Sequence, residues 1–159
     1  MAQVNYPRRK PTRLRGLDYQ SPNNVFFLTL CCKNGLCLFV HDDFNRKVVQ
    51  CIGMERERVG HAVYVYCLMP DHIHLLSSPI ESGISVSQFM SGLSGKITRL
   101  SWEHGFSGKV MQRSFHDHLV RKDEDMRQVA EYIINNPVRK GLVDKWEEYP
   151  YCGFLDQIP

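Results

Sequence analysis

No stretch of this sequence approaches the roughly 18 consecutive apolar residues that a membrane-spanning helix needs. The basic N-terminus has no apolar segment behind it, so it does not have the form of a secretory signal. Internal repeats and low-complexity linkers are also missing. These absences predict a cytoplasmic protein without a membrane partner, and 159 residues is the length of one domain.

Cysteine is present, but it lacks the spacing that metal clusters and redox motifs require. The six cysteines form no C-x-x-C pair. Cys31 and Cys32 are adjacent, so they face opposite sides of a strand. Disulfides need an oxidising compartment, which the absence of a signal argues against. We therefore expect reduced and mostly buried thiols rather than a zinc cluster.

The net charge is only +3, but the positive charge is unevenly distributed. Five cations fall within the first sixteen residues, where Pro7 and Pro11 oppose helix formation. Such an arm suits a polyanion, because each cation that neutralises a phosphate releases counterions. A merely solvated tail is the other reading. The cations are Arg8, Arg9, Lys10, Arg13 and Arg15.

Apolar periodicity and turn residues predict an α+β domain. The expected order is strand, helix, strand, strand, helix, strand, helix, which fits a ferredoxin-like antiparallel sheet with helices packed on one side. Asp42 or Asp43 should cap the first helix and Gly60 should end it. The expected strands are 25–31, 61–68, 72–77 and 110–120, and the expected helices are 44–59, one from Ser85 onward, and one that opens at 123–125 and stops at Pro137.

The second expected helix has two unlike sides. One side carries an apolar stripe, whereas the other is small, hydroxylated and basic. The polar side could lie on a sugar-phosphate backbone, and a solvated surface explains it equally well. Its residues are Ser85, Ser87, Ser91, Ser94, Lys96, Thr98 and Arg99.

Two histidines, His72 and His74, stand two residues apart in the segment MPDHIHLL. Side chains two apart on a strand point to the same face, so both imidazoles project together while Ile73 and Leu75 enter the core. Two neighbouring neutral imidazoles are typical ligands of a divalent cation. A metal site is one reading and a structural role is the other, because two ligands do not complete a site.

Tyr132 and Asn136 lie near the end of the last expected helix. Residues four apart lie one above the other on a helix, and Ile133 can hold this helix on the sheet. Asn136 directly precedes Pro137, where its amide oxygen should be free to reach outward. Packing and turn formation are the ordinary roles of such residues, and the histidine pair adds a catalytic reading.

Four segments of the chain together resemble the single-tyrosine HUH transposases, in particular the REP-associated tyrosine transposases of the insertion sequence 200-like family. In chain order they read FFLTLC, MPDHIHL, SFHDH and YIINNPVRKG, and the resemblance spans roughly residues 8–155. H-x-H alone is a weak signal. The segment MPDHIH followed by YIxxNPVRxG is a specific one.

The resemblance implies an HUH nuclease fold that binds Mg²⁺ or Mn²⁺. His72 and His74 match the family's histidine ligands, Asn136 matches its third ligand, and Tyr132 matches its nucleophile. Attack by the tyrosine on a phosphodiester would leave a 5′-phosphotyrosine and a free 3′-OH. It also implies three parts of the chain: a basic arm over 1–20, an HUH transposase domain over 21–145 and a tail over 146–159.

The partner that the resemblance implies is single-stranded DNA with hairpins, such as REP-like palindromes, handled in the cytoplasm near the nucleoid. The arm could grip the hairpin stem, and four further cations flank the proposed site. Both a monomer and a homodimer that exchanges the tyrosine helix remain open. The four cations are Arg113, Arg121, Arg139 and Lys140.

A second H-x-H pair, His116 and His118, is open to several interpretations. The two could orient the site, contact DNA phosphate, join a four-histidine metal site, or be structural. The resemblance favours His118 over His116 as an accessory residue.

Two other functions stay open beside DNA strand transfer. A non-catalytic hairpin binder could use the same sheet, since ferredoxin-like sheets also bind RNA. A metal hydrolase of small phosphoesters could use all four histidines. The presence of Tyr132 and Asn136 with His72 and His74 argues against the binder, and the lack of a carboxylate-rich cluster argues against the hydrolase.

Overall fold

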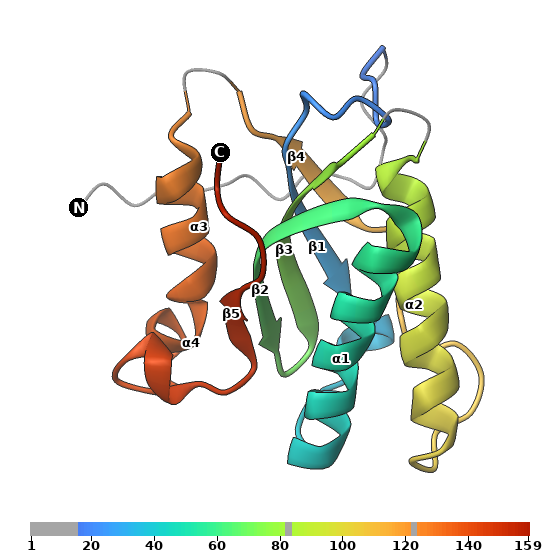
Figure 1. The fold of residues 1–159 in the computed structure, drawn as a ribbon. Coiled ribbons are helices and arrows are strands. Elements are labelled where there is room, and N and C mark those ends of the chain that lie inside the picture. The colour runs from blue at the N-terminus through green and yellow to red at the C-terminus, as the bar shows by residue number, and fades with distance from the viewer. Residues whose placement is uncertain (1–15, 82–83, 122–123) are drawn as a thin grey trace.

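A five-stranded antiparallel sheet runs through the centre of this computed structural model, which describes residues 16–81, 84–121 and 124–159 (Figure 1). The five arm cations from Arg8 to Arg15 lie outside the described residues. The spatial order of the strands is β4-β1-β3-β2-β5. Their bounds are β1 Phe26–Cys31, β2 His61–Met69, β3 His72–Pro79, β4 His116–Leu119 and β5 Cys152–Phe154. The predicted α+β class with a ferredoxin-like antiparallel sheet is confirmed.

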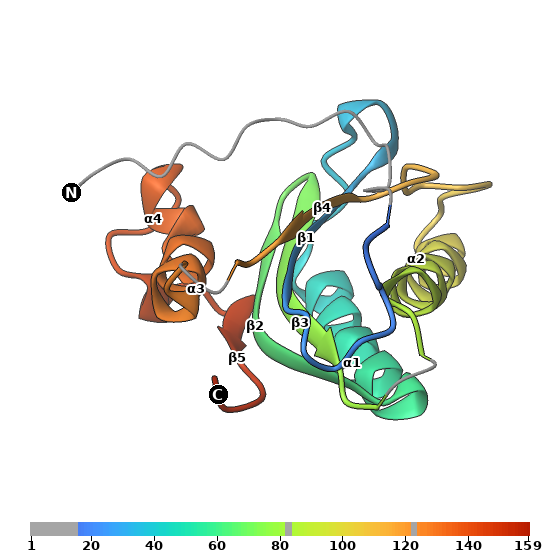
Figure 2. The ribbon, with the colours of Figure 1, turned by 90° about the horizontal axis from the view of Figure 1, so that it is seen from above.

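Helices cover both faces of the sheet, so the prediction that they all lie on one side is wrong. Figures 1 and 2 show α1 (Asp42–Val59) and α2 (Val86–Trp102) on one face, and α3 (Met126–Ile134) and α4 (Asn136–Arg139) on the other. The reason lies in β2, which is buried at nearly every position instead of at alternate ones. A strand that is apolar on both sides needs a cover on both sides.

Each face of the sheet has its own hydrophobic core. The core under α1 and α2 contains Phe26, Leu28, Ile73 and Leu75. The core under α3 contains Phe27 and Leu76, among others. Two short 3-10 helices, Lys33–Gly35 and Trp146–Glu148, complete the regular structure. Among the described residues, no helix has both the length and the apolar character to cross a membrane.

The helix starts follow local chemistry, with one correction. The N-cap of α1 is His41, so the expectation that Asp42 or Asp43 caps it is wrong. Both carboxylates instead lie in the first turn, where the helix dipole favours negative charge. Gly60 ends α1 in the left-handed conformation, with φ of 71°, as predicted. Ser85 caps α2 through a reciprocal capping box with Gln88, which confirms the predicted start.

The fourth strand is shorter than the predicted 110–120, because only His116–Leu119 pairs with β1. Within the preceding segment, Met111 makes an isolated bridge to Cys32. Val110, Met111 and Phe115 bury their side chains in the core under α1 and α2. Three consecutive polar residues, Gln112 to Ser114, interrupt the alternation that a continuous strand requires.

A buried carboxylate locks α1 against α2. The side chain of Glu55 is fully buried and pairs with Arg58 at 2.6 Å and with Lys96 at 3.7 Å. Hydrogen bonding to Arg58 is the main cause that holds the pKa of Glu55 below its ordinary value. Gly92 on α2 leaves the space for this carboxylate, since a Cβ atom there would lie 1.8 Å from Oε1 of Glu55.

Gly92→Ala should destabilise the protein, whereas Gly95→Ala should not. Alanine in mid-helix is about 1 kcal/mol better than glycine at either site. At residue 92 the methyl group would displace Glu55 from its ion pairs, and overpacking of this kind costs about 1–3 kcal/mol. At residue 95 the nearest atom is the Nη1 of exposed Arg99 at 3.4 Å, which can move aside. Urea unfolding of the two variants measures the difference, and equal stabilities would contradict this account of the packing.

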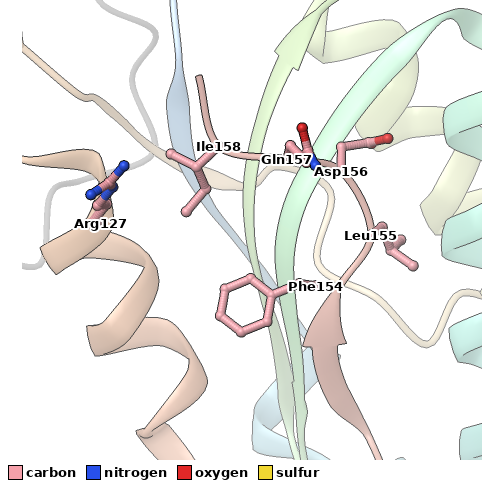
Figure 3. A pocket seen from close by; sticks show the side chains of 6 residues that line it. All are labelled: Arg127, Phe154, Leu155, Asp156, Gln157 and Ile158. Atoms are coloured by element: carbon pink, nitrogen blue, oxygen red, sulfur yellow. The ribbon is translucent and has the colours of Figure 1, made fainter.

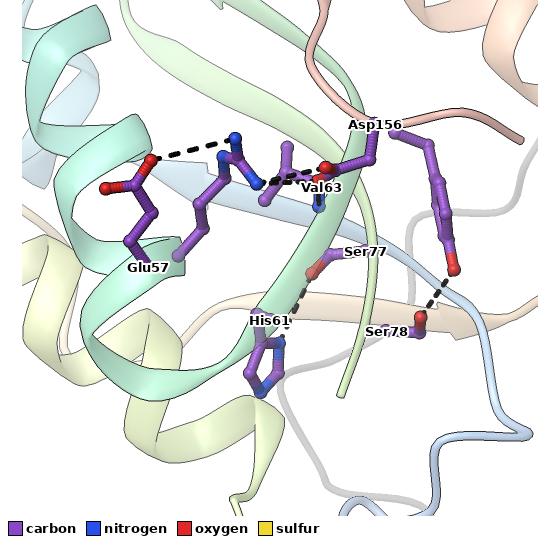
Figure 4. A network of polar contacts seen from close by, with 8 residues as sticks. Glu57, His61, Val63, Ser77, Ser78 and Asp156 are labelled. Atoms are coloured by element: carbon purple, nitrogen blue, oxygen red, sulfur yellow. Dashed lines mark hydrogen bonds and ion pairs between the residues drawn. The ribbon is translucent and has the colours of Figure 1, made fainter. Parts of the chain in front are cut away.

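The C-terminal segment is fixed to the sheet by Asp156. The carboxylate accepts hydrogen bonds from Nη1 of Arg56 at 3.0 Å and from the backbone N–H of Val63 at 2.8 Å, beside the irregularity in β2 (Figure 4). Nearby, the hydroxyls of Tyr64 and Ser78 lie 2.7 Å apart (Figure 4). Within residues 146–159, the segment 152–154 forms β5 and pairs with β2.

Candidate active site

The paired histidines His72 and His74 lie on the face of the sheet that α3 covers. Ile73 and Leu75 between and beside them are fully buried in the opposite core, which confirms the predicted alternation. Thr29 on β1 is the cross-strand partner of His74. Each imidazole is half-buried, so the pair lies at the margin of the core and not within it.

The two imidazoles face each other through their Nε2 atoms, which are 3.1 Å apart. The Nδ1 atom of His72 lies 2.6 Å from Oδ1 of Asp71, and the Nδ1 atom of His74 lies 2.9 Å from Oγ1 of Thr29. A carboxylate only accepts hydrogen bonds, so Asp71 places the His72 proton on Nδ1. The lone pair of His72 Nε2 therefore points at His74.

Thr29 lets His74 switch tautomers without movement of any heavy atom. A hydroxyl can donate or accept, so His74 can carry its proton on either nitrogen. Two lone pairs would repel at 3.1 Å, hence one proton lies between the Nε2 atoms when no cation does. When Thr29 accepts from Nδ1, both Nε2 lone pairs become available to one cation. Partners of this kind on the far nitrogen are what orient histidine ligands in metal sites.

The donor set fits a divalent cation. Two ligand nitrogens about 2.1 Å from one ion and at right angles to each other are about 3.0 Å apart, close to the separation found here. Among the described residues, no cluster of three or more His, Cys, Asp and Glu side chains is suited to a metal. A third protein ligand would therefore be of another type, such as an amide.

The electrostatic environment keeps His74 neutral. Burial is the largest cause that lowers its pKa well below 6.5, followed by the neighbouring His72 and by the charges of Arg139 and Lys140. A lowered pKa means that the free base persists as the pH falls below the ordinary value. This is the form that a metal ligand needs.

Tyr132 on α3 lies on the same side of the sheet as the histidine pair. The ring of Phe27 contacts both sides, with its centroid 5.2 Å from His74 and 6.0 Å from Tyr132. The guanidinium carbon of Arg139 lies 4.2 Å from the centroid of the Tyr132 ring. Phe27 therefore contacts both the Tyr132 ring and one imidazole of the pair.

Asn136 differs from its prediction in two respects. The helix does not run to Pro137, because α3 ends at Ile134 and Pro137 lies in the first turn of α4, where its fixed φ is favourable. The expectation that the Asn136 amide reaches outward is wrong, since the residue is only 4% exposed. Its Nδ2 atom has no hydrogen-bond partner within the described ranges.

An orphaned amide at this position is costly without a ligand. Leaving a buried polar group unpaired costs about 1–3 kcal/mol. The two ends of a carboxamide exchange by a flip, so the same side chain can present its oxygen to a cation. Asn136 therefore fits the third-ligand role better as a buried group than it would as an outward one.

His116 and His118 share the sheet face of the first histidine pair. Their register partners on β1 are Thr29 and Phe27 respectively, and partners in an antiparallel ladder point the same way. His118 directs Nε2 to both carboxylate oxygens of Glu124, at 3.0 and 3.1 Å. Glu124 also accepts a hydrogen bond from the backbone N–H of Arg121. These contacts of Glu124 tie β4 to the start of α3, the helix that carries Tyr132.

Four residues of the site were not singled out from the sequence: Phe27, Thr29, Asp71 and Glu124. Asp71 directly precedes His72, and a carboxylate beside a histidine ligand is a signal that could have identified it. Phe27 and Thr29 come from another strand, and Glu124 from the loop before α3. Their roles depend on pairing that local sequence does not encode.

The predicted cations fall into separate groups. Arg139 and Lys140 lie close enough to act on His74, whereas Arg113 and Arg121 are exposed residues just before and just after β4. The polar side of α2 lies on the other face of the sheet, so it does not line this site (Figure 2). Within it, Lys96 pairs with Glu55 and Thr98 is buried.

The chain places two facing imidazoles on an antiparallel sheet and a tyrosine on a helix packed against the same face. Comparison with known proteins gives the family to which a chain of this kind belongs. Residues 25–136 match the family model described as "Transposase IS200 like". The match covers more than half of the chain, which therefore belongs to the IS200-like transposase family.

Two relatives and one solved structure are similar to this chain over most of its length. An uncharacterized protein of Haemophilus influenzae is 29% identical over 168 residues, covering 82% of this chain and 88% of the relative. A REP-associated tyrosine transposase of Escherichia coli K12 is 22% identical over 137 residues, covering 86% of this chain and 79% of the relative. The solved structure of a REP-associated tyrosine transposase bound to a REP hairpin superposes with a TM-score of 0.70 at 19% identity, covering 84% of this chain and 78% of that one. This likeness confirms the predicted HUH fold.

Proposed function

We propose that this protein is a REP-associated tyrosine transposase that cleaves and rejoins single-stranded DNA beside hairpins, with Mg²⁺ or Mn²⁺ as cofactor and a covalent 5′-phosphotyrosine as intermediate. The observation that carries the proposal is the pair of Nε2 atoms 3.1 Å apart on the face where Phe27 contacts Tyr132. Membership of the transposase family supports DNA as the substrate. The hairpin bound to the structural neighbour supports a palindromic target.

The cofactor would be held by His72, His74 and Asn136, and it would supply positive charge to the non-bridging oxygens of the scissile phosphate. The hydroxyl of Tyr132 loses its proton to solvent as it attacks phosphorus in line and forms the Tyr–O–P bond. The P–O3′ bond breaks, and the leaving 3′-oxygen takes up one proton from solvent to become a free 3′-OH, so no net proton is released. A later 3′-OH attacks the phosphotyrosine in the reverse sense, so rejoining needs no ATP.

Arg139 has two partners in this scheme. Its guanidinium lies over the Tyr132 ring and holds the phenol at the site through a cation–π contact, which is worth about 0.5–2 kcal/mol. A bidentate guanidinium is also a strong ligand for phosphate. We assign Arg139 and Lys140 to the phosphates next to the cleaved bond.

The remaining cations belong to hairpin binding in this proposal. Arg113 and Arg121 flank β4, and the arm from Arg8 to Arg15 would contact the stem. His118 acts through Glu124 as a positioning residue for α3. The reaction would take place in the cytoplasm at the nucleoid, and we propose a monomer in which Tyr132 acts beside Phe27 of its own chain.

The native protein should form a covalent adduct with DNA. The full chain is incubated with Mn²⁺ and a labelled single-stranded oligonucleotide that carries a hairpin with unpaired flanks. An SDS-resistant protein–DNA band should appear with Mn²⁺ or Mg²⁺ and disappear with EDTA. Hairpin binding without an adduct would instead favour the non-catalytic binder.

A further inference from the structure

A surface hollow lies on the side of α3 that faces away from the histidine pair. The C-terminal segment and the start of α3 flank a shallow, open hollow of about 450 Å³. Phe154 and Ile158 project into it from the C-terminal segment, and Arg127 faces them from α3 (Figure 3). Gln157 and Asp156 line its other end.

Phe154 offers an open aromatic surface at this hollow. The residue is 50% exposed, and its ring contacts Trp146 in a T-shaped arrangement with 6.0 Å between the ring centroids. The contact with Trp146 stabilises the orientation of the ring. A half-exposed ring of this kind provides a surface on which a planar group can stack.

The charges around the hollow select the class of ligand. Asp156 is neutralised by Arg56 and by the N–H of Val63, so it does not repel an anion. Arg127 is exposed on the first turn of α3, and its backbone N–H donates to Asp125. The amide of Gln157 is exposed and offers both a donor and an acceptor. A ring, an amide and a cation are the three groups that bind the base, the base edge and the phosphate of an unpaired nucleotide.

We infer that this hollow binds one unpaired nucleotide of the DNA flank, with the base on Phe154, its edge on Gln157 and its phosphate on Arg127. The inference rests on the proposed function only for the identity of the strand. Arg127 precedes Tyr132 by five residues on α3, about 7.5 Å along the helix axis. A strand cleaved at Tyr132 can therefore cross α3 and reach the hollow.

The test uses the full chain and hairpin oligonucleotides that carry 2-aminopurine at successive positions of the flank. With the native protein, fluorescence should be quenched at one position more than at the others. Phe154→Leu should remove this quenching and weaken binding about tenfold, because one stacked base is worth about 1–3 kcal/mol. Phe154→Tyr should retain both. Arg127→Gln should reduce the slope of log binding constant against log salt concentration by about 0.7 in magnitude. This is the contribution of one phosphate contact on a single strand.

Trp102→Leu is the matched control, since Trp102 is 51% exposed and lies on α2 across the sheet. It should change neither quenching nor affinity. Native-like quenching in Phe154→Leu, or an unchanged salt slope in Arg127→Gln, would overturn the inference. The same oligonucleotides report the adduct separately: quenching without an adduct refutes only the proposed function, and an adduct with position-independent fluorescence refutes only the nucleotide site.

Discussion

Tyr132→Phe should abolish the covalent adduct, lowering its yield at least about a thousandfold, as loss of a nucleophile does in other enzymes. The substitution removes only the hydroxyl. The ring contacts with Phe27 and Arg139 remain, so folding stability and hairpin affinity should stay near native values. Adduct yield is read from SDS gels, and affinity from fluorescence anisotropy.

Tyr151→Phe is the control for Tyr132→Phe. Its hydroxyl bonds Asp42 at 2.5 Å, and its ring packs against the core under α1 and α2, on the other face of the sheet from the site, so its loss should leave the adduct intact. Strand cleavage that continues in Tyr132→Phe would contradict the phosphotyrosine mechanism. That outcome would favour the metal hydrolase.

His72→Ala should abolish metal-dependent cleavage, by about a thousandfold or more, because charge stabilisation by a bound ion is worth several kcal/mol. Hairpin affinity should be largely unchanged, since the substitution alters none of the cations that we assign to the hairpin. Mn²⁺ binding, followed by calorimetry or by the electron paramagnetic resonance of free Mn²⁺, should be lost together with cleavage.

Thr29→Val and Asp71→Asn should each lower Mn²⁺ affinity by about 10- to 100-fold, because Thr29 and Asp71 orient the histidine ligands.

His41→Ala is the control for the metal experiment, since His41 is exposed at the start of α1. Its Mn²⁺ affinity and cleavage should equal those of the native chain. If His72→Ala retained native Mn²⁺ affinity, the facing imidazoles would not be the metal site.

Local sequence was sufficient to predict the parts of the fold that depend on periodicity. The alternation around His72 gave the shared face of the two imidazoles, and the apolar stripe gave a helix from Ser85 onward, where a capping box with Gln88 begins α2. These features are decided within a few residues. The arrangement of helices on two faces depends on how β2 is covered on both sides, and that is a property of the whole packing.

The errors at the end of α3 have a similar cause. Proline both terminates a helix and begins one, so Pro137 alone could not distinguish a stop from the first turn of α4. Whether Asn136 is exposed depends on where that second helix packs. The contacts of Thr29 and Glu124 with histidines distant in sequence were likewise inaccessible to local patterns.

The alternation of the first four residues of β3 restricts how this protein can change over evolution. A single-residue insertion or deletion ahead of His72 that shifted the ladder by one position would turn both imidazoles into the core under α1 and α2 and would put Ile73 and Leu75 in their place on the other face. Catalytic competence and structural integrity would then be lost in one mutational event. Lineages of this chain should therefore tolerate length variation in their connecting loops but not within this strand.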